Sequence, residues 1–192
     1  MVEPLVITVL AENTVYLRGL LAEHGLALHI QAGKRGLLFD TGQSDVLLRN
    51  ARQLGINLAT TEAIVLSHGH NDHTGGISLA REAAPQAKVF LHPAALAAKF
   101  ARAPDGAGYA IGMEKASAEV LQRGGQQVAP TTQPTEVLPG VFITGEIPRR
   151  NDFEDAGGPF FLDPACTQPD PLLDDQALFF DTDRGLVVLF GC

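Results

Sequence analysis

The sequence predicts a mixed α/β fold, and three observations favour that class. Short apolar runs alternate with amphipathic stretches over residues 5–129, an order typical of strand and helix units. Turn residues at 33–35 and 182–185 indicate hairpins, which add antiparallel strands to the sheet. The chain has 192 residues, 45% of them apolar and 19% charged, which suits one globular core. We therefore expect a single domain over residues 1–192.

The first half of the chain supplies four strands and two helices. Apolar runs between turn residues predict strands at 5–10, 26–31, 36–40 and 63–67. The spacing of apolar side chains predicts a helix at 45–54, with Ser44 as its N-cap and Gly55 as its stop. A second helix is expected at 76–84.

The second half continues the alternation and then changes character. Helices are expected at 93–101, where Pro93 occupies the first turn, and at 116–123. Strands are expected at 88–91, 126–129, 136–138, 141–144, 177–181 and 186–190. Between the strands expected at 141–144 and 177–181, residues 146–175 are rich in proline, glycine and aspartate and show no regular spacing of apolar residues. A loop of this length is typical of a lid, a binding loop or a disordered segment.

Composition and charge disfavour several classes of function. The formal net charge of −8, with no basic cluster larger than Arg149 and Arg150, disfavours binding to nucleic acid or to an anionic membrane. No apolar run reaches the length that spans a bilayer, and the first ten residues lack the pattern of a secretory signal. Two cysteines, Cys166 and Cys192, are expected as free thiols. We therefore expect a cytoplasmic location.

The chemistry is concentrated in an H-x-H-x-D-H segment that follows a predicted buried strand. It places His68, His70, Asp72 and His73 within six residues. Imidazole and carboxylate groups suit zinc, iron or manganese, and His68 and His70 can point to one side of an extended turn and share an ion. Asp72 and His73 are adjacent and can serve a second ion beside the first. The segment predicts a metal site; the alternative is a solvated loop.

Other residues are weaker candidates for the same site. His92 follows the strand at 88–91, where a loop could bring it to the pocket, and Asp175 ends the long loop. Asp163 and Asp174 are further candidates for contact with a metal ion or substrate. Cys192 could in principle supply a thiolate ligand, but a cysteine at the end of a strand is expected to be incidental. His24 and His29 are expected in the core or on the surface.

The H-x-H-x-D-H segment resembles the signature of the metallo-β-lactamase superfamily. The resemblance extends to residues 37–42, which contain Asp40, and residues 144–149 and 185–192 resemble the branch of dihydropterin-ribofuranosylaminobenzene-phosphate synthases. It implies an αββα sandwich with His68 and His70 at the first metal and Asp72 and His73 at the second. It also implies that Asp72 orients water or accepts a proton, and that Asp40 hydrogen-bonds near the ligands.

One departure from the family pattern affects the expected ligand set. Family members place a further ligand histidine soon after the segment that resembles residues 191–192, and another nearer the C terminus. The sandwich is therefore expected with its second half truncated, and each metal with about two protein ligands, fewer than the three typical of catalytic zinc. Another chain or another residue of this chain could complete the site, or the site could be weak or empty.

The expected function is metal-dependent hydrolysis. A metal-bound hydroxide would cleave an ester, phosphoester, thioester or cyclic amide in a small-molecule substrate. Zinc is the first expectation for the ion, one or two per chain, with manganese or iron as alternatives. Two other functions stay open: a catalytically silent domain that binds metal or joins an assembly, which includes a homo-oligomer, and a di-iron redox protein on the same scaffold.

Overall fold

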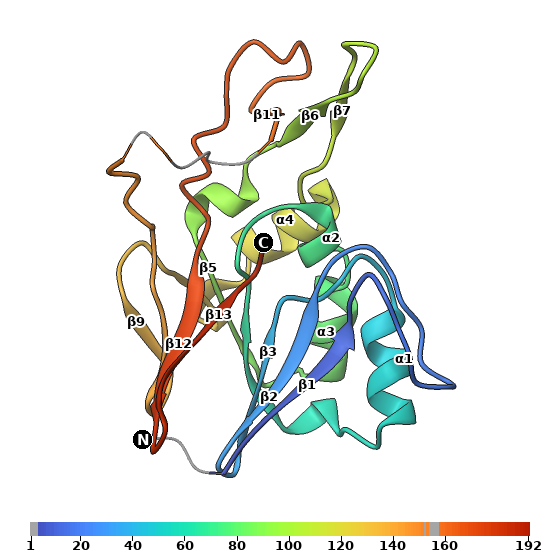
Figure 1. Ribbon diagram of the computed structural model, residues 1–192, viewed down its shortest axis with the longest axis vertical. Coiled ribbons are helices and arrows are strands. Elements are labelled where there is room, and N and C mark those ends of the chain that lie inside the picture. Colours follow the sequence, from blue (N-terminus) through green and yellow to red (C-terminus); the bar gives the residue numbers. More distant parts are fainter. Residues whose placement is uncertain (1–3, 152, 154–157) are drawn as a thin grey trace.

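The computed structural model describes residues 4–151, 153 and 158–192 (Figure 1). Its largest element is a six-stranded sheet in the order β1-β2-β3-β4-β5-β8. The strands are β1 (Leu5–Ala11), β2 (Ala27–Ala32), β3 (Arg35–Phe39), β4 (Thr61–Val65), β5 (Lys88–Leu91) and β8 (Val128–Pro130). Strands β1, β2 and β3 pair antiparallel with one another in that order. Strand β3 then pairs parallel with β4, β4 with β5, and β5 with β8. The predicted mixed sheet is therefore confirmed.

Two smaller sheets accompany the first. A four-stranded antiparallel sheet has the order β13-β12-β10-β9, and a three-stranded sheet has the order β11-β6-β7. The strands of the four-stranded sheet are β9 (Thr135–Leu138), β10 (Val141–Ile143), β12 (Ala177–Thr182) and β13 (Gly185–Phe190). The strands of the three-stranded sheet are β6 (Phe100–Arg102), β7 (Gly108–Ala110) and β11 (Phe160–Phe161). We call the three-stranded sheet the arm; it projects beyond the two larger sheets (Figure 1).

Helices cover one face of the six-stranded sheet, and the four-stranded sheet covers the other. The longer helices are α1 (Val46–Gln53), α3 (Ile77–Ala83) and α4 (Lys115–Gln122). The short ones are α2 (Asn71–Thr74) and the 3₁₀ turns η1 (Leu58–Thr60), η2 (Pro93–Leu96) and η3 (Gly125–Gln127). None of the helices in the described ranges is long and apolar enough to cross a membrane.

Side-chain alternation along the central strands builds two cores. In β3, Leu38 joins the core beneath the helices, whereas Leu37 and Phe39 join the core between the sheets. In β4, Ile64 faces the helices and Val65 faces the second sheet. This period of two is the geometry of an extended strand that is buried on both faces. The layers place the ends of β3, β4 and β5 at one edge, where polar side chains gather.

Two sequence-based expectations about helices were wrong. Residues 93–101 form only the short turn η2, because the chain then leaves to pair as β6 with both β7 and β11. Helix propensity is a local property of the sequence, so it does not predict this pairing between segments that are distant in the chain. Ser44 does not cap α1; its hydroxyl donates instead to Glu23 Oε2 over 2.5 Å, and Asp45 takes the N-cap position.

Candidate metal centre

Between strand β4 and helix α3 the chain forms a compact turn that contains the H-x-H-x-D-H segment. We call residues 67–74 the histidine turn. His68, His70 and His73 are all buried there. The ring centroid of His68 lies 4.5 Å from that of His70 and 4.3 Å from that of His73. The turn therefore brings the three predicted histidines together.

Two ring nitrogens at this point lack a protein partner. The Nε2 atoms of His68 and His70 are buried and make no hydrogen bond within the described part of the chain. An unpartnered buried polar atom costs about 1–3 kcal/mol, so the arrangement fits a ligand that both atoms bind. Burial and the nearby His73, His70 and Lys99 hold the pKa of His68 well below its usual value, and burial also lowers the pKa of His70. Both rings thus favour the neutral form that binds metal ions.

Asp40 fixes the third histidine. Its Oδ2 lies 2.7 Å from His73 Nδ1, and its carboxylate is fully buried. Burial lowers the pKa of His73, but hydrogen bonds to Asp40 and Cys192 and the charges of Asp40 and Asp72 outweigh it and raise the pKa to about 10. His73 therefore holds a proton in the metal-free protein, and a metal ion would displace it from Nε2.

Ser67 links Asp40 to the first histidine, a role that no sequence pattern indicated. Its backbone N–H donates to Asp40 Oδ1 and its hydroxyl donates to Asp40 Oδ2, both over 2.7 Å. Ser67 Oγ also lies 2.8 Å from His68 Nδ1. Because the hydroxyl proton is used on Asp40, Oγ accepts from Nδ1–H, which leaves a lone pair on His68 Nε2. One carboxylate thus orients both His68 and His73.

Asp72 lies at the rim of the histidine turn, with its side chain 16% exposed. Its Oδ2 is 3.5 Å from His73 Nε2 and 3.2 Å from His24 Nδ1. No sequence pattern connects His24 with the site, because His24 and Asp72 lie far apart in the chain. Gly25 allows the approach: its φ is +120°, and a Cβ there would lie 1.8 Å from Asp72 O.

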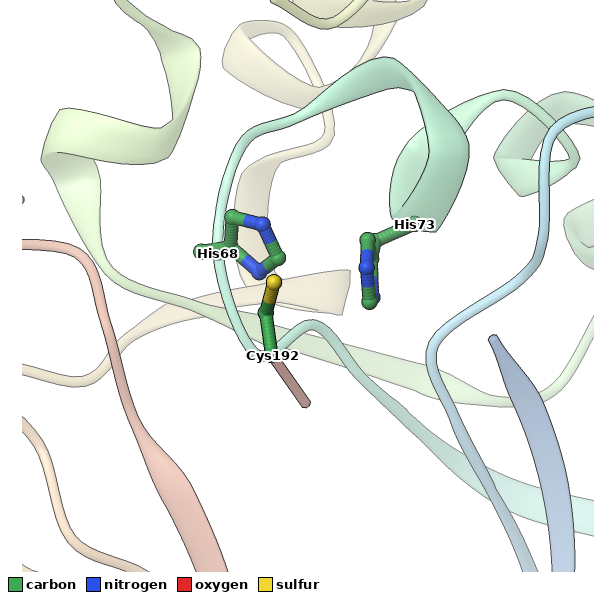
Figure 2. A group of neighbouring side chains, drawn as sticks. All are labelled: His68, His73 and Cys192. Carbon is green, nitrogen blue, oxygen red and sulfur yellow. The ribbon is translucent and has the colours of Figure 1, made fainter. Parts of the chain in front are cut away.

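Cys192 approaches the same point from the end of β13. Ligand atoms of His68, His73 and Cys192 all lie within 4.8 Å of one another, and Figure 2 shows the three side chains converging. A cavity of about 260 Å³ opens beside them. It is lined by Glu12, Asn13, His24, Gly25, Leu26, Asp72, His73, Gly191 and Cys192. Sulfur and imidazole ligands together suit zinc.

The weaker candidates make contacts of their own, and one of them reaches the histidine turn. His92 is buried, but its Nδ1 accepts from Ala94 N–H and caps η2. Asp175 pairs with Arg149 over 2.8 Å, and burial raises the pKa of its carboxyl despite that partner. Asp163 binds the backbone of its own loop. Of the acidic residues near the long loop, Asp174 reaches the histidine turn, where its Oδ2 accepts from Gly69 N–H over 2.8 Å.

Comparison with known proteins identifies the family. The sequence pattern of the metallo-beta-lactamase superfamily matches residues 22–167, which include Asp40 and the whole histidine turn. The chain belongs to the metallo-beta-lactamase superfamily. It is 30% identical over 181 residues to a 7,8-dihydropterin-6-methyl-4-(beta-D-ribofuranosyl)-aminobenzene-5'-phosphate synthase of Methanocaldococcus jannaschii. The match covers 89% of this chain and 61% of that relative.

Solved structures of the superfamily share the fold. A candidate metallo-beta-lactamase from Thermotoga maritima superposes with a TM-score of 0.54 at 13% identity, over 96% of this chain and 76% of that one. MEM-A1, a subclass B3 metallo-beta-lactamase from a soil metagenome library, superposes with a TM-score of 0.52 at 18% identity. That match covers 87% of this chain and 56% of that one. At these identities the likeness concerns the fold alone. The resemblance inferred from the sequence and the fold class are thus confirmed.

Proposed function

We propose that this chain is a metal-dependent hydrolase that acts on a small molecule with an ester, phosphoester, thioester or cyclic amide bond. The observation that carries the proposal is the pair of buried, unpartnered Nε2 atoms on His68 and His70. These atoms adjoin a third histidine whose other nitrogen is fixed by Asp40. Metal-ligating histidines are commonly oriented in this way through the nitrogen that faces away from the ion.

The donor set supports a proposed role for each residue. His68 and His70 would hold one ion, and Asp72 and His73 a second, with Cys192 as a further donor beside His68 and His73. When bound, the ions supply an activated water and polarise the substrate bond. Asp72 would orient that water or accept its proton, and its partial exposure at the cavity supports this role. Zinc suits the imidazole and thiol donors, with manganese or iron as alternatives.

A synthase is the second candidate function. The 30% identity to the Methanocaldococcus synthase, which extends over 89% of this chain, favours it. The chain spans only 61% of that relative, so the relative's reaction comes to this chain as a proposal alone. The net charge of −8 continues to favour a small-molecule substrate over nucleic acid or a membrane. A cytoplasmic location stays part of the proposal.

A metal-dependent activity screen tests the proposal. The protein, stripped with chelator and reloaded with zinc, manganese or iron(II), would be assayed on p-nitrophenyl esters, bis-p-nitrophenyl phosphate, a thioester and a lactone. We expect turnover of at least one substrate class, dependent on added metal and reduced at least about 100-fold in His70→Ala. Metal binding without turnover of any class would contradict hydrolysis and favour the synthase or the silent domain. Redox-dependent absorbance with iron would favour the di-iron protein.

A further inference from the structure

A buried lysine lies close to the histidine turn. The side chain of Lys99 is 1% exposed, and its Nζ donates to Asp170 Oδ2 over 2.7 Å and to Asp174 Oδ1 over 2.8 Å. Both carboxylates are buried as well. Burying three charged groups costs free energy of desolvation, which their mutual attraction repays only when the geometry is good. Such a cluster is therefore not explained by stability alone.

The carboxylate of Asp174 connects this cluster to the metal ligands. Its second oxygen, Oδ2, accepts from the backbone N–H of Gly69, the residue between His68 and His70. Two residues along, Gln176 N–H donates to Ser67 O over 3.0 Å, and its side-chain amide donates to Leu66 O over 3.2 Å. Residues 174–176 thus support the chain from Leu66 to Gly69 from one side.

The backbone of Lys99 is also connected to the histidine turn, through residues 111 and 112. Its carbonyl oxygen accepts from the N–H groups of Ile111 and Gly112. Ile111 O in turn accepts from Asn71 N–H over 2.7 Å, and Gly112 forms a β-bridge with His70. The arm is therefore joined to the segment that carries His70.

The partner Asp170 brings in a third segment. Its backbone N–H donates to Phe160 O over 2.9 Å, and the Phe160 ring lies 4.8 Å from the ring of His70. The ammonium group of Lys99 thus holds Asp170 and Asp174, while the segments around residues 111 and 160 join through the backbone of Lys99 and of Asp170. The segments around residues 111, 160 and 174 each contact the histidine turn directly. The single charge of Lys99 is the only side-chain group among the described contacts that joins Asp170 to Asp174.

We propose that Lys99 and Asp174 are positioning residues that set the orientation of His68 and His70 for a metal ion. The inference rests on the proposed metal-dependent function. Asp174 fixes the peptide between the two histidines, and Lys99 fixes the carboxylate of Asp174. Neither side chain is placed to touch the ion, since the oxygens of Asp174 are used on Gly69 N–H and Lys99 Nζ. Outer hydrogen-bonding groups of this kind commonly change metal affinity 10–100-fold.

Asp174→Asn is the variant that tests positioning. It keeps the shape of the side chain and an acceptor for Gly69 N–H but loses the charge that holds Lys99. Lys99→Met and Lys99→Arg form a second pair, in which arginine restores the charge. Arg35→Met is the matched control. Arg35, at the start of β3, forms an exposed ion pair with Glu62 over 2.7 Å, and this pair lies away from the histidine turn. Circular dichroism would be used to check that each variant is folded.

Cobalt(II) binding is the main measurement. We expect Asp174→Asn to raise the Kd for cobalt at least about 10-fold and to alter the visible ligand-field spectrum, with Arg35→Met like the wild type. Lys99→Met should raise the Kd for cobalt as much as Asp174→Asn does, and Lys99→Arg should bring the Kd part of the way back toward the wild-type value. If Lys99→Met does not fold, the cobalt Kd and spectrum of Asp174→Asn alone decide whether the inference holds. A folded Asp174→Asn protein with wild-type Kd and spectrum would overturn the inference while the proposed function stands.

A measurement on the metal-free protein separates the two proposals. If the wild type binds no cobalt, the proposed function fails, and the positioning role is then judged from the ¹⁵N signals of the His68 and His70 rings. Shifted ring signals in Asp174→Asn, but not in Arg35→Met, would support positioning of the rings. Unchanged ring signals in Asp174→Asn would overturn it.

Discussion

Replacing Asp40 by alanine is expected to lower the free energy of unfolding by about 3–5 kcal/mol and to prevent metal binding. The carboxylate is fully buried and makes three short bonds, to the Ser67 N–H, the Ser67 hydroxyl and His73 Nδ1. Removing one partner of a buried charge pair leaves the other charge, here the protonated His73, without compensation. The rings of His68 and His73 would also lose the group that orients them.

Two further variants separate the contributions of Asp40. Its φ is 60°, a left-handed conformation that asparagine tolerates better than alanine, so Asp40→Asn removes the charge with less backbone strain. Asp183→Ala, in the exposed turn between β12 and β13, is the control. Urea unfolding and cobalt titration measure the two effects. A stable Asp40→Ala protein that binds cobalt as the wild type does would refute the role given to this carboxylate.

Gly25→Ala is expected to destabilise the protein by about 2–6 kcal/mol. Alanine at a φ of +120° costs about 1–3 kcal/mol, and its Cβ would lie 1.8 Å from the backbone oxygen of Asp72, which adds about 1–3 kcal/mol of overpacking. Because backbone must move, the loop that carries His24 would separate from Asp72. We therefore also expect weaker binding of the second metal ion.

Gly185→Ala is the matched control for Gly25→Ala. Gly185 has a φ of +114°, and nothing lies within 4 Å of the position of its Cβ. This variant therefore carries the backbone strain without the steric clash. Urea unfolding of both variants gives the difference between them, which we expect to be at least about 1 kcal/mol. Equal losses of stability would show that the contact between Gly25 and Asp72 is not close in solution.

The parts of the fold that were predictable are those specified by local patterns. Strand β4 is a buried apolar run, and the H-x-H-x-D-H segment follows it directly, so the position of the histidine turn follows from adjacent residues. The hairpin of β12 and β13 is likewise set by its turn and by two apolar runs. Asp40 was found through its motif, and the structure places it against His73.

The parts that were missed depend on contacts distant in sequence. The arm consists of strands of two or three residues, which are too short to show a period and form only by pairing with one another. Asp174 meets Gly69 across 105 residues, so nothing in the sequence distinguishes it from Asp163 or Asp175. The same holds for His24, whose contact with Asp72 requires the approach that Gly25 allows.

Metal content per chain, measured by elemental mass spectrometry, tests the central claim most directly. The protein would be purified without chelator or a histidine tag, loaded with excess zinc and desalted, beside the variants His68→Ala and Asp72→Ala. One metal site at His68 and His70 and a second at Asp72 and His73 would give about two equivalents in the wild type, with about one or fewer in each variant. Less than about a tenth of an equivalent in the wild type after loading would contradict the claim that this chain holds a metal centre.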